Sequence, residues 1–254
     1  MTGEVNGRPF VAKIHILLNR KGGVGKSLIS INLGAVCADV AGPRPDGRPS
    51  VAVASADPQG TSLWRAARLV DQPFDVLDIS GDLENIELLK KLPYGHIFVD
   101  TPGWAEITPE QYEAGEDPLG NDKYGRLLKA LLDQADDAIV PILTEPDSFE
   151  PTWQTIEWVI KPRGLAYQVV INNWPPAEGI AYVDGTRAFC EQHGWPVART
   201  VIRRYRVHTN ATKVVTQYHN NRVELQARED FYRFALEHGM RGASARLDEI
   251  TVGS

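Results

Sequence analysis

A glycine-rich run between an apolar segment and a helix-like segment constrains this sequence more than any other feature. The run reads NRKGGVGKS over residues 19–27 and directly follows the apolar segment KIHILL, residues 13–18. Consecutive backbone N–H groups in such a turn, at the start of a helix, can surround a phosphate group. The run therefore predicts a phosphate-binding loop, although a glycine-rich turn with incidental lysines has the same composition.

The loop contains two lysines where a phosphate site needs only one. Lys26 is expected to reach the β and γ phosphates of a nucleotide, and the hydroxyl of Ser27 is expected to ligate Mg²⁺. The residues expected to contact the nucleotide are Lys21, Gly22, Gly23, Val24, Gly25, Lys26, Ser27 and Leu28. The strict pattern G-x-x-x-x-G-K-[ST] would place glycine at position 20, where this chain has Arg20.

Short β-branched segments alternate with longer helical patterns along the whole chain. Strands are expected over residues 13–19, 50–55, 74–79, 96–100, 137–143, 167–173 and 197–202, with helical segments between them and a last helix over 224–238. Nearly continuous apolar strands are typical of a parallel sheet that is covered on both faces. The sequence thus predicts an α/β fold: one P-loop domain over 1–254, with a doubly wound, mostly parallel sheet and helices on both faces.

Composition and cysteine usage narrow the class of protein. The chain has 254 residues, of which 43% are hydrophobic and 24% charged, so it can bury a sizeable core. Its first residues contain no basic region followed by a long apolar run, and no apolar stretch reaches membrane-spanning length, so we expect a cytoplasmic protein. Cys37 and Cys190 form no CxxC or Cys/His spacing, which favours buried thiols over a metal cluster.

The loop KGGVGKS, with its extra Lys21, resembles the deviant Walker A motif of the ParA/MinD ATPases. In that family the extra lysine reaches the nucleotide of the partner subunit, so dimerisation depends on ATP. The resemblance implies an ATPase that binds ATP and Mg²⁺ and forms a homodimer in the ATP-bound state. It assigns Lys21, Lys26 and Asp57 to catalysis. Because few residues precede the first expected strand, we do not expect the N-terminal helix-turn-helix that the larger ParA proteins carry.

Two further segments match motifs of the same family. SADPQGTSLW, residues 55–64, resembles the D-P-Q-G-S/T element, in which the aspartate, here Asp57, helps to activate the attacking water; it could equally cap a helix or form an Asx-turn. The family often has an acid where this chain has Ser55. HIFVDTPG, residues 96–103, has the Walker B pattern, and Asp100 is expected to hold Mg²⁺ through water.

The base pocket is less sharply defined by the sequence. VVINNW, residues 169–174, resembles a family strand that ends in an asparagine in contact with adenine. Either Asn172 or Asn173 is expected to fill this role, although asparagines at strand ends often only stabilise turns.

A strongly basic stretch follows in a chain whose formal net charge is -6. Residues 192–223 contain no Asp or Glu, and the candidate DNA-binding residues there are Arg199, Arg203, Arg204, Arg206, Lys213 and Arg222. A basic face can bind the phosphate backbone without reading sequence. The alternatives are a solvated face balanced by nearby acids, or, for Arg203 and Arg204, a place in the nucleotide site.

The resemblance and the basic stretch together favour a DNA-partition ATPase. In this reading an ATP-bound dimer binds nonspecific double-stranded DNA, is associated with the nucleoid, and is released by hydrolysis that a ParB-type or centromere-binding adaptor stimulates. The main alternative is a ParA-like ATPase that positions a cargo other than DNA. A MinD-like membrane-cycling ATPase is less favoured, because the final residues lack a basic amphipathic helix and no membrane partner is expected. Residues 103–122 form a long segment after the Walker B strand and are either a partner contact or a surface excursion.

Overall fold

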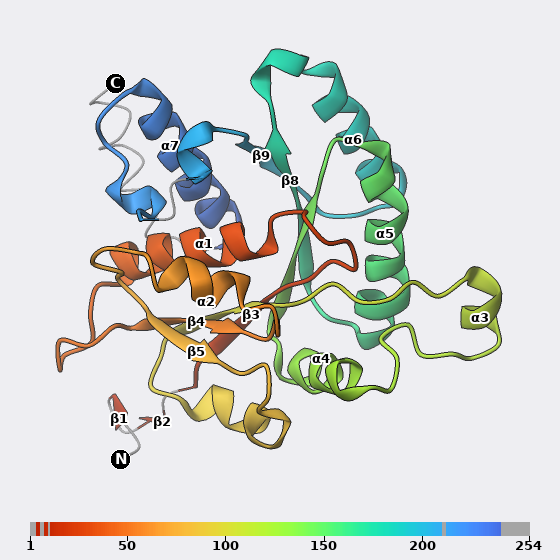
Figure 1. Ribbon diagram of the computed structural model, residues 1–254, viewed down its shortest axis with the longest axis horizontal. Coiled ribbons are helices and arrows are strands. Elements are labelled where there is room, and N and C mark those ends of the chain that lie inside the picture. Colours follow the sequence, from red (N-terminus) through yellow and green to blue (C-terminus); the bar gives the residue numbers. More distant parts are fainter. Residues whose placement is uncertain (1–3, 6–7, 10, 210–211, 240–254) are drawn as a thin grey trace.

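The computed structural model describes residues 4–5, 8–9, 11–209 and 212–239, and its centre is a seven-stranded sheet (Figure 1). All neighbouring strands of this sheet pair in parallel. In spatial order the strands are β5 (Asp75–Asp78), β4 (Val51–Ser55), β6 (His96–Asp100), β3 (Lys13–Leu17), β7 (Asp137–Ile142), β8 (Tyr167–Trp174) and β9 (Val197–Arg203). The predicted doubly wound fold is confirmed. A short antiparallel pair, β1 (Glu4–Val5) with β2 (Arg8–Pro9), precedes it.

Helices cover both faces of the sheet (Figure 1). On one face lie α1 (Lys26–Ala41), with α2 (Thr61–Ala66) beside it, and α7 (Arg222–Glu237). The other face carries α4 (Lys123–Gln134), α5 (Phe149–Gln154) with its continuation, and α6 (Ala181–Gln192). Successive side chains of a strand point to opposite faces, so Ile14 and Ile16 pack into one core and Leu17 into the other. Because helices cover both faces, nearly every position of a central strand is apolar.

Some predicted helical segments take other helical forms. Residues 82–92 form a 3₁₀ helix over Leu83–Lys91 instead of an α-helix. Residues 151–160 do not continue as one α-helix, because α5 passes into a π-helical turn over Thr155–Ile160. The segment 103–122 contains one short helix, α3 (Pro109–Glu113), which Thr108 caps. These differences are local and leave the order of strands unchanged.

The structure also bears on the predictions about the two cysteines, about membrane-spanning segments and about the final residues. Both cysteines are buried and free, and burial raises the pKa of each thiol to about 12, so neither is poised to react as a thiolate. Among the described residues no helix combines the length and the apolar character needed to cross a membrane. The expectation about the final residues, 240–254, lies outside the described part of the chain.

Candidate nucleotide site

The phosphate-binding loop lies at the carboxyl ends of the strands, where the sheet order reverses. The loop joins β3 to α1, and β3 has β6 on one side and β7 on the other. Ligands of doubly wound sheets bind at such a switch point. A cavity of about 780 Å³ opens there, and its lining includes Gly22, Gly23, Gly25, Lys26, Ser27, Leu28 and Asp57. The structure thus brings together most of the predicted nucleotide residues.

Backbone conformation explains two of the glycines. Gly23 and Gly25 have φ angles of 78° and 95°, a region that side chains with a Cβ rarely adopt. At Gly25 a Cβ would also collide with the amide nitrogen of Asn172. That amide donates a hydrogen bond of 2.7 Å to the carbonyl of Val24. The buried Asn172 therefore stabilises the conformation of the loop.

The two loop lysines occupy different environments. Lys26 is 7% exposed, and its Nζ donates to the carbonyls of Asn19, at 2.9 Å, and of Lys21, at 3.0 Å. Burial lowers the pKa of Lys26 to about 8, while the nearby Asp100 and Asp57 act in the opposite direction. The ammonium is thus held inside the loop, in a place where phosphate oxygens would replace the carbonyls.

Lys21 points away from that interior. Its Nζ lies 2.5 Å from Oδ2 of Asp147 and donates to the carbonyl of the same residue at 3.1 Å. The Lys21 side chain is 22% exposed, and that of Asp147 is 75% exposed. Lys21 therefore lies at the edge of the site, paired with its own chain, and a solvent-accessible pair of this kind can be exchanged at little cost.

Asp100 is a buried carboxylate with no hydrogen bond to either oxygen from the described residues. Burial raises its pKa to about 6, and Ser27, Ser62 and Lys26 act in the opposite direction. An unsatisfied carboxylate beside a serine hydroxyl fits a hard divalent cation, which prefers oxygen ligands. The residues present thus fit Mg²⁺. Ser55 is the partner of Asp100 in the β4–β6 register and is itself buried, so a neutral hydroxyl stands beside the Asp100 strand position.

Asp57 takes the turn role that the sequence offered, and its catalytic role stays a prediction. Its Oδ1 accepts a hydrogen bond of 2.9 Å from the backbone N–H of Gln59, which is an Asx-turn. The residue also lines the cavity. The turn fixes the carboxylate at the mouth of the site, where a water that attacks a phosphate could be oriented.

The segment 103–122 forms a wall of the cavity, which the sequence did not predict. Its residues in the lining are Gly103, Trp104, Ala105, Ile107, Pro118, Leu119, Gly120, Asn121 and Asp122. Arg20, which stands where the strict loop pattern has glycine, forms an ion pair with this segment: its Nη1 lies 3.4 Å from Oε2 of Glu106. Tyr112 stacks on Trp158 with ring centroids 4.5 Å apart and anchors the far end. The signal available in the sequence was the capping pattern Thr108 to Gln111, which marks an ordered helix start.

A second cavity, of about 500 Å³, adjoins the first and shares Leu28 and Arg65 with it. Both candidate asparagines reach its wall. Asn172 is buried and donates its amide N–H to the loop, while its Oδ1 accepts no hydrogen bond from the described residues. Asn173 is half-buried and has a φ of 60°. Asn173 is therefore the more accessible of the two for contact with a base.

The basic stretch divides into residues with different surroundings. Arg203 forms a two-pronged ion pair with the buried Asp230, with Nη2 to Oδ1 at 2.6 Å and Nε to Oδ2 at 2.9 Å. Arg204 and Arg206 are exposed and line the second cavity. The other candidates are Arg199, exposed beside Glu229 and Glu237, Lys213, half-buried, and Arg222, exposed at the start of α7.

His208, in the wall of the second cavity, makes the stability of the chain depend on pH. It is buried, and neither ring nitrogen has a hydrogen bond from the described residues. Burial, and secondarily Arg65, lowers its pKa from 6.5 to about 4. Between these values the unfolded chain binds a proton that the folded chain does not, so stability falls as the pH falls from 6.5 to 4.

We expect this effect to cost about 3 kcal/mol by pH 4, and His208→Leu to abolish that part of the pH dependence. Urea unfolding of the parent and the variant at intervals between pH 7.5 and pH 4 measures the difference. Parallel curves for the two proteins would show that His208 is solvated and titrates normally.

The parallel sheet and the glycine-rich loop between β3 and α1 have the arrangement of a P-loop nucleotide-binding fold. No protein-family model matches the chain. The maintenance of carboxysome distribution protein A of Gloeobacter kilaueensis is 26% identical to this chain over 201 residues. The matched region covers 78% of this chain and 80% of that relative.

Among the solved structures that share the fold are a partition protein and a MinD protein. The putative plasmid partition protein of Borrelia burgdorferi bound to AMPPNP has a TM-score of 0.58, with 15% identity over 90% of this chain and 99% of its own. The septum site-determining protein MinD of Pyrococcus horikoshii, in complex with Mg-ADP, has a TM-score of 0.56, with 16% identity over 90% and 96%. The chain thus has the fold of the ParA/MinD-type proteins, and the resemblance predicted from its sequence is confirmed at the level of the fold.

Proposed function

We propose that this chain is an ATP-switched ATPase that positions a cargo by cycling on and off DNA. The observation that carries the proposal is the different placement of two loop lysines. Lys26 is buried among loop carbonyls, where it would neutralise phosphate charge within its own subunit. Lys21 is at the edge of the site, and its ion pair among the described residues is with Asp147, so it can exchange that partner for a phosphate across a two-fold interface.

The residues of the site would divide the work of hydrolysis. Ser27 and Asp100 would hold Mg²⁺, which when bound neutralises triphosphate charge. Asp57, fixed by its Asx-turn, would orient the attacking water. Trp104 and the rest of the segment 103–122 would exclude bulk water from the cavity. Asn173 would contact the base, with Asn172 holding the loop.

Exposed arginines near this site would couple the nucleotide state to DNA. Arg204 and Arg206 are exposed and line the second cavity. This cavity shares Leu28, at the end of the loop, with the nucleotide cavity. One subunit's arginines would bind a duplex weakly, and a dimer would present two sets at once, so that avidity rises through effective concentration. Dimerisation on ATP would then switch DNA affinity without a separate device.

The cargo is proposed to be a body other than a plasmid or chromosome. The Gloeobacter relative is named for the distribution of carboxysomes, and the match to this chain covers 80% of its length. Plasmid partition is the second candidate, because the Borrelia neighbour of the same fold is described as a putative partition protein. Either cargo would need an adaptor protein that stimulates hydrolysis. Deleting the gene should disperse or cluster a protein body while plasmid and chromosome inheritance stay unchanged; plasmid loss would favour the second candidate.

DNA binding should appear only with ATP and Mg²⁺, and should depend on Arg204 and Arg206. The test is binding of the full chain to random-sequence duplex without nucleotide, with ADP and with ATP plus Mg²⁺, across a salt series. We expect Arg204→Ala/Arg206→Ala, which removes four charges per dimer, to lower the salt slope by up to about 4.

The matched control is Arg48→Ala/Lys91→Ala, which removes the same charge from exposed residues that precede β4 and β6, at the opposite edge of the sheet. It should bind DNA like the parent. Equal losses in the two double variants would mean that net charge alone, and not this face, governs binding. DNA binding that ignores nucleotide would refute the switch.

A further inference from the structure

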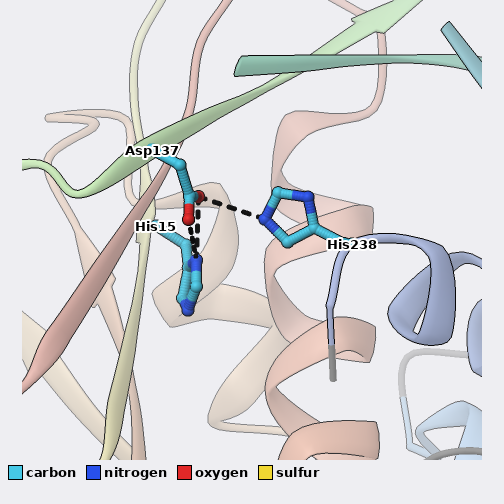
Figure 2. Close-up of side chains that lie close together, drawn as sticks. All are labelled: His15, Asp137 and His238. Carbon is cyan, nitrogen blue, oxygen red and sulfur yellow. Dashed lines mark hydrogen bonds and ion pairs between the residues drawn. The ribbon is translucent and has the colours of Figure 1, made fainter. Parts of the chain in front are cut away.

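The side chains of His15, Asp137 and His238 meet (Figure 2). They lie toward the amino ends of β3 and β7, whereas the nucleotide site lies at the carboxyl ends. His15 lies in β3, Asp137 begins β7, and His238 follows α7. Nδ1 of His15 is 2.8 Å from Oδ1 of Asp137, and Nε2 of His238 is 3.1 Å from the same oxygen. One potential ligand atom from each residue lies within 4.8 Å of the others. These residues line neither of the two cavities described above.

We propose that His15, Asp137 and His238 bind a divalent transition-metal ion, and that Zn²⁺ is the ion they fit. Two imidazoles and one carboxylate are ligands that Zn²⁺ accepts, with a water molecule completing a tetrahedron. Bonds of about 2.0–2.1 Å would place tetrahedral ligand atoms roughly 3.3 Å apart. The observed separations of the two histidines from Asp137 need only small movements to reach that spacing.

The outer hydrogen bonds of both histidines support a metal ion. The second nitrogen of His15, Nε2, lies 2.9 Å from Nδ1 of His96, and the second nitrogen of His238, Nδ1, lies 3.0 Å from Oε1 of Gln168. Histidines that bind a metal almost always donate their other N–H to an acceptor. Both rings here meet that condition as neutral ligands.

The two nitrogens of His238 are directed at different partners. Nε2 faces the carboxylate of Asp137, and Nδ1 faces the side-chain amide of Gln168. With a metal ion on Nε2, the Nδ1–H would donate to Gln168. The cluster thus offers one nitrogen of each histidine to an ion and pairs the other within the protein.

Packing and local charge also bear on the site. The side chains are 2%, 12% and 6% exposed for His15, Asp137 and His238, so water competes little for the ligands. The ring of His15 stacks on Phe98, with centroids 4.8 Å apart, which fixes its direction. The carboxyl end of α7 adds partial negative charge. Lys13 opposes a cation, because its Nζ lies 3.7 Å from Oδ2 of Asp137.

A bound ion would join the end of α7 to two central strands. The test is titration of the full chain, stripped of metal with a chelator and free of nucleotide, with Zn²⁺ by calorimetry, and with Co²⁺ by visible absorption. We expect one Zn²⁺ per chain, a tetrahedral Co²⁺ spectrum and a higher melting temperature with Zn²⁺ but not with Mg²⁺. His238→Ala should weaken binding by more than the about 10- to 100-fold that loss of an outer hydrogen-bonding partner causes.

Two further variants keep the test informative if His238→Ala is unstable. Lys13→Met removes the opposing charge and should tighten Zn²⁺ binding, whereas Gln168→Ala should weaken it by about tenfold or more. His219→Ala, which removes an exposed histidine outside the cluster, is the control and should change nothing. Absence of Zn²⁺ binding, or binding that is the same in His238→Ala and Lys13→Met as in the parent, would overturn the proposal.

Discussion

Lys26→Ala is expected to lower the rate of ATP hydrolysis by about 100-fold or more, the largest functional effect we predict. The ammonium of Lys26 is held inside the loop by two carbonyls, with little exposure to solvent. A positive charge in such a water-poor place interacts with developing phosphate charge far more strongly than it would in water. Steady-state hydrolysis with Mg²⁺, measured alongside nucleotide binding by calorimetry, gives the result.

Lys21→Ala is the matched comparison, because it removes the same ammonium from a position five residues away. This variant should bind ADP within a few-fold of the parent and fail to dimerise with ATP, as measured by light scattering. Since the Lys21 pair with Asp147 is solvent-accessible, its loss should cost little stability. If Lys21→Ala dimerised normally, the proposed exchange across the interface would be wrong even though the fold is right.

The fold could be predicted because its signals are local and repeated. Most strands are short runs rich in β-branched residues, and the glycine- and lysine-rich loop between β3 and α1 is typical of a phosphate-binding turn. The 3₁₀ helix at Leu83–Lys91 and the π-helical turn at Thr155–Ile160 could not be predicted, because helices of the three kinds share nearly the same side-chain periodicity. Which form is adopted depends on packing against neighbours.

The site was predictable where a motif fixes the backbone and unpredictable where only tertiary contacts decide. Lys26 and Ser27 follow from the loop itself. By contrast, nothing in VVINNW reveals that Asn172 reaches across to Val24, and nothing near Arg20 reveals its partner Glu106. The basic stretch shows the same limit most clearly, since the acid that neutralises Arg203 lies outside the stretch, in α7.

That acid makes Arg203→Ala the variant with the largest expected loss of stability, about 3 kcal/mol. The Arg203 guanidinium donates to both oxygens of Asp230 and to the carbonyl of Gln226. Asp230 is 4% exposed, so removing its partner leaves a buried charge uncompensated. Urea unfolding should show the loss, while Arg204→Ala, which removes an exposed neighbour, should stay within about 0.5 kcal/mol of the parent.

A double variant separates the pair from other effects of truncation. Arg203→Ala/Asp230→Ala should recover part of the loss, because the stranded carboxylate is removed as well. Burial already raises the pKa of Asp230, and without Arg203 that pKa should rise further, so lowering the pH should protonate the carboxylate and reduce the cost of Arg203→Ala. If the cost of Arg203→Ala were the same at pH 5 and pH 8 and were not reduced in the double variant, the pair would be solvated, and Arg203 would return to the set of arginines available for DNA.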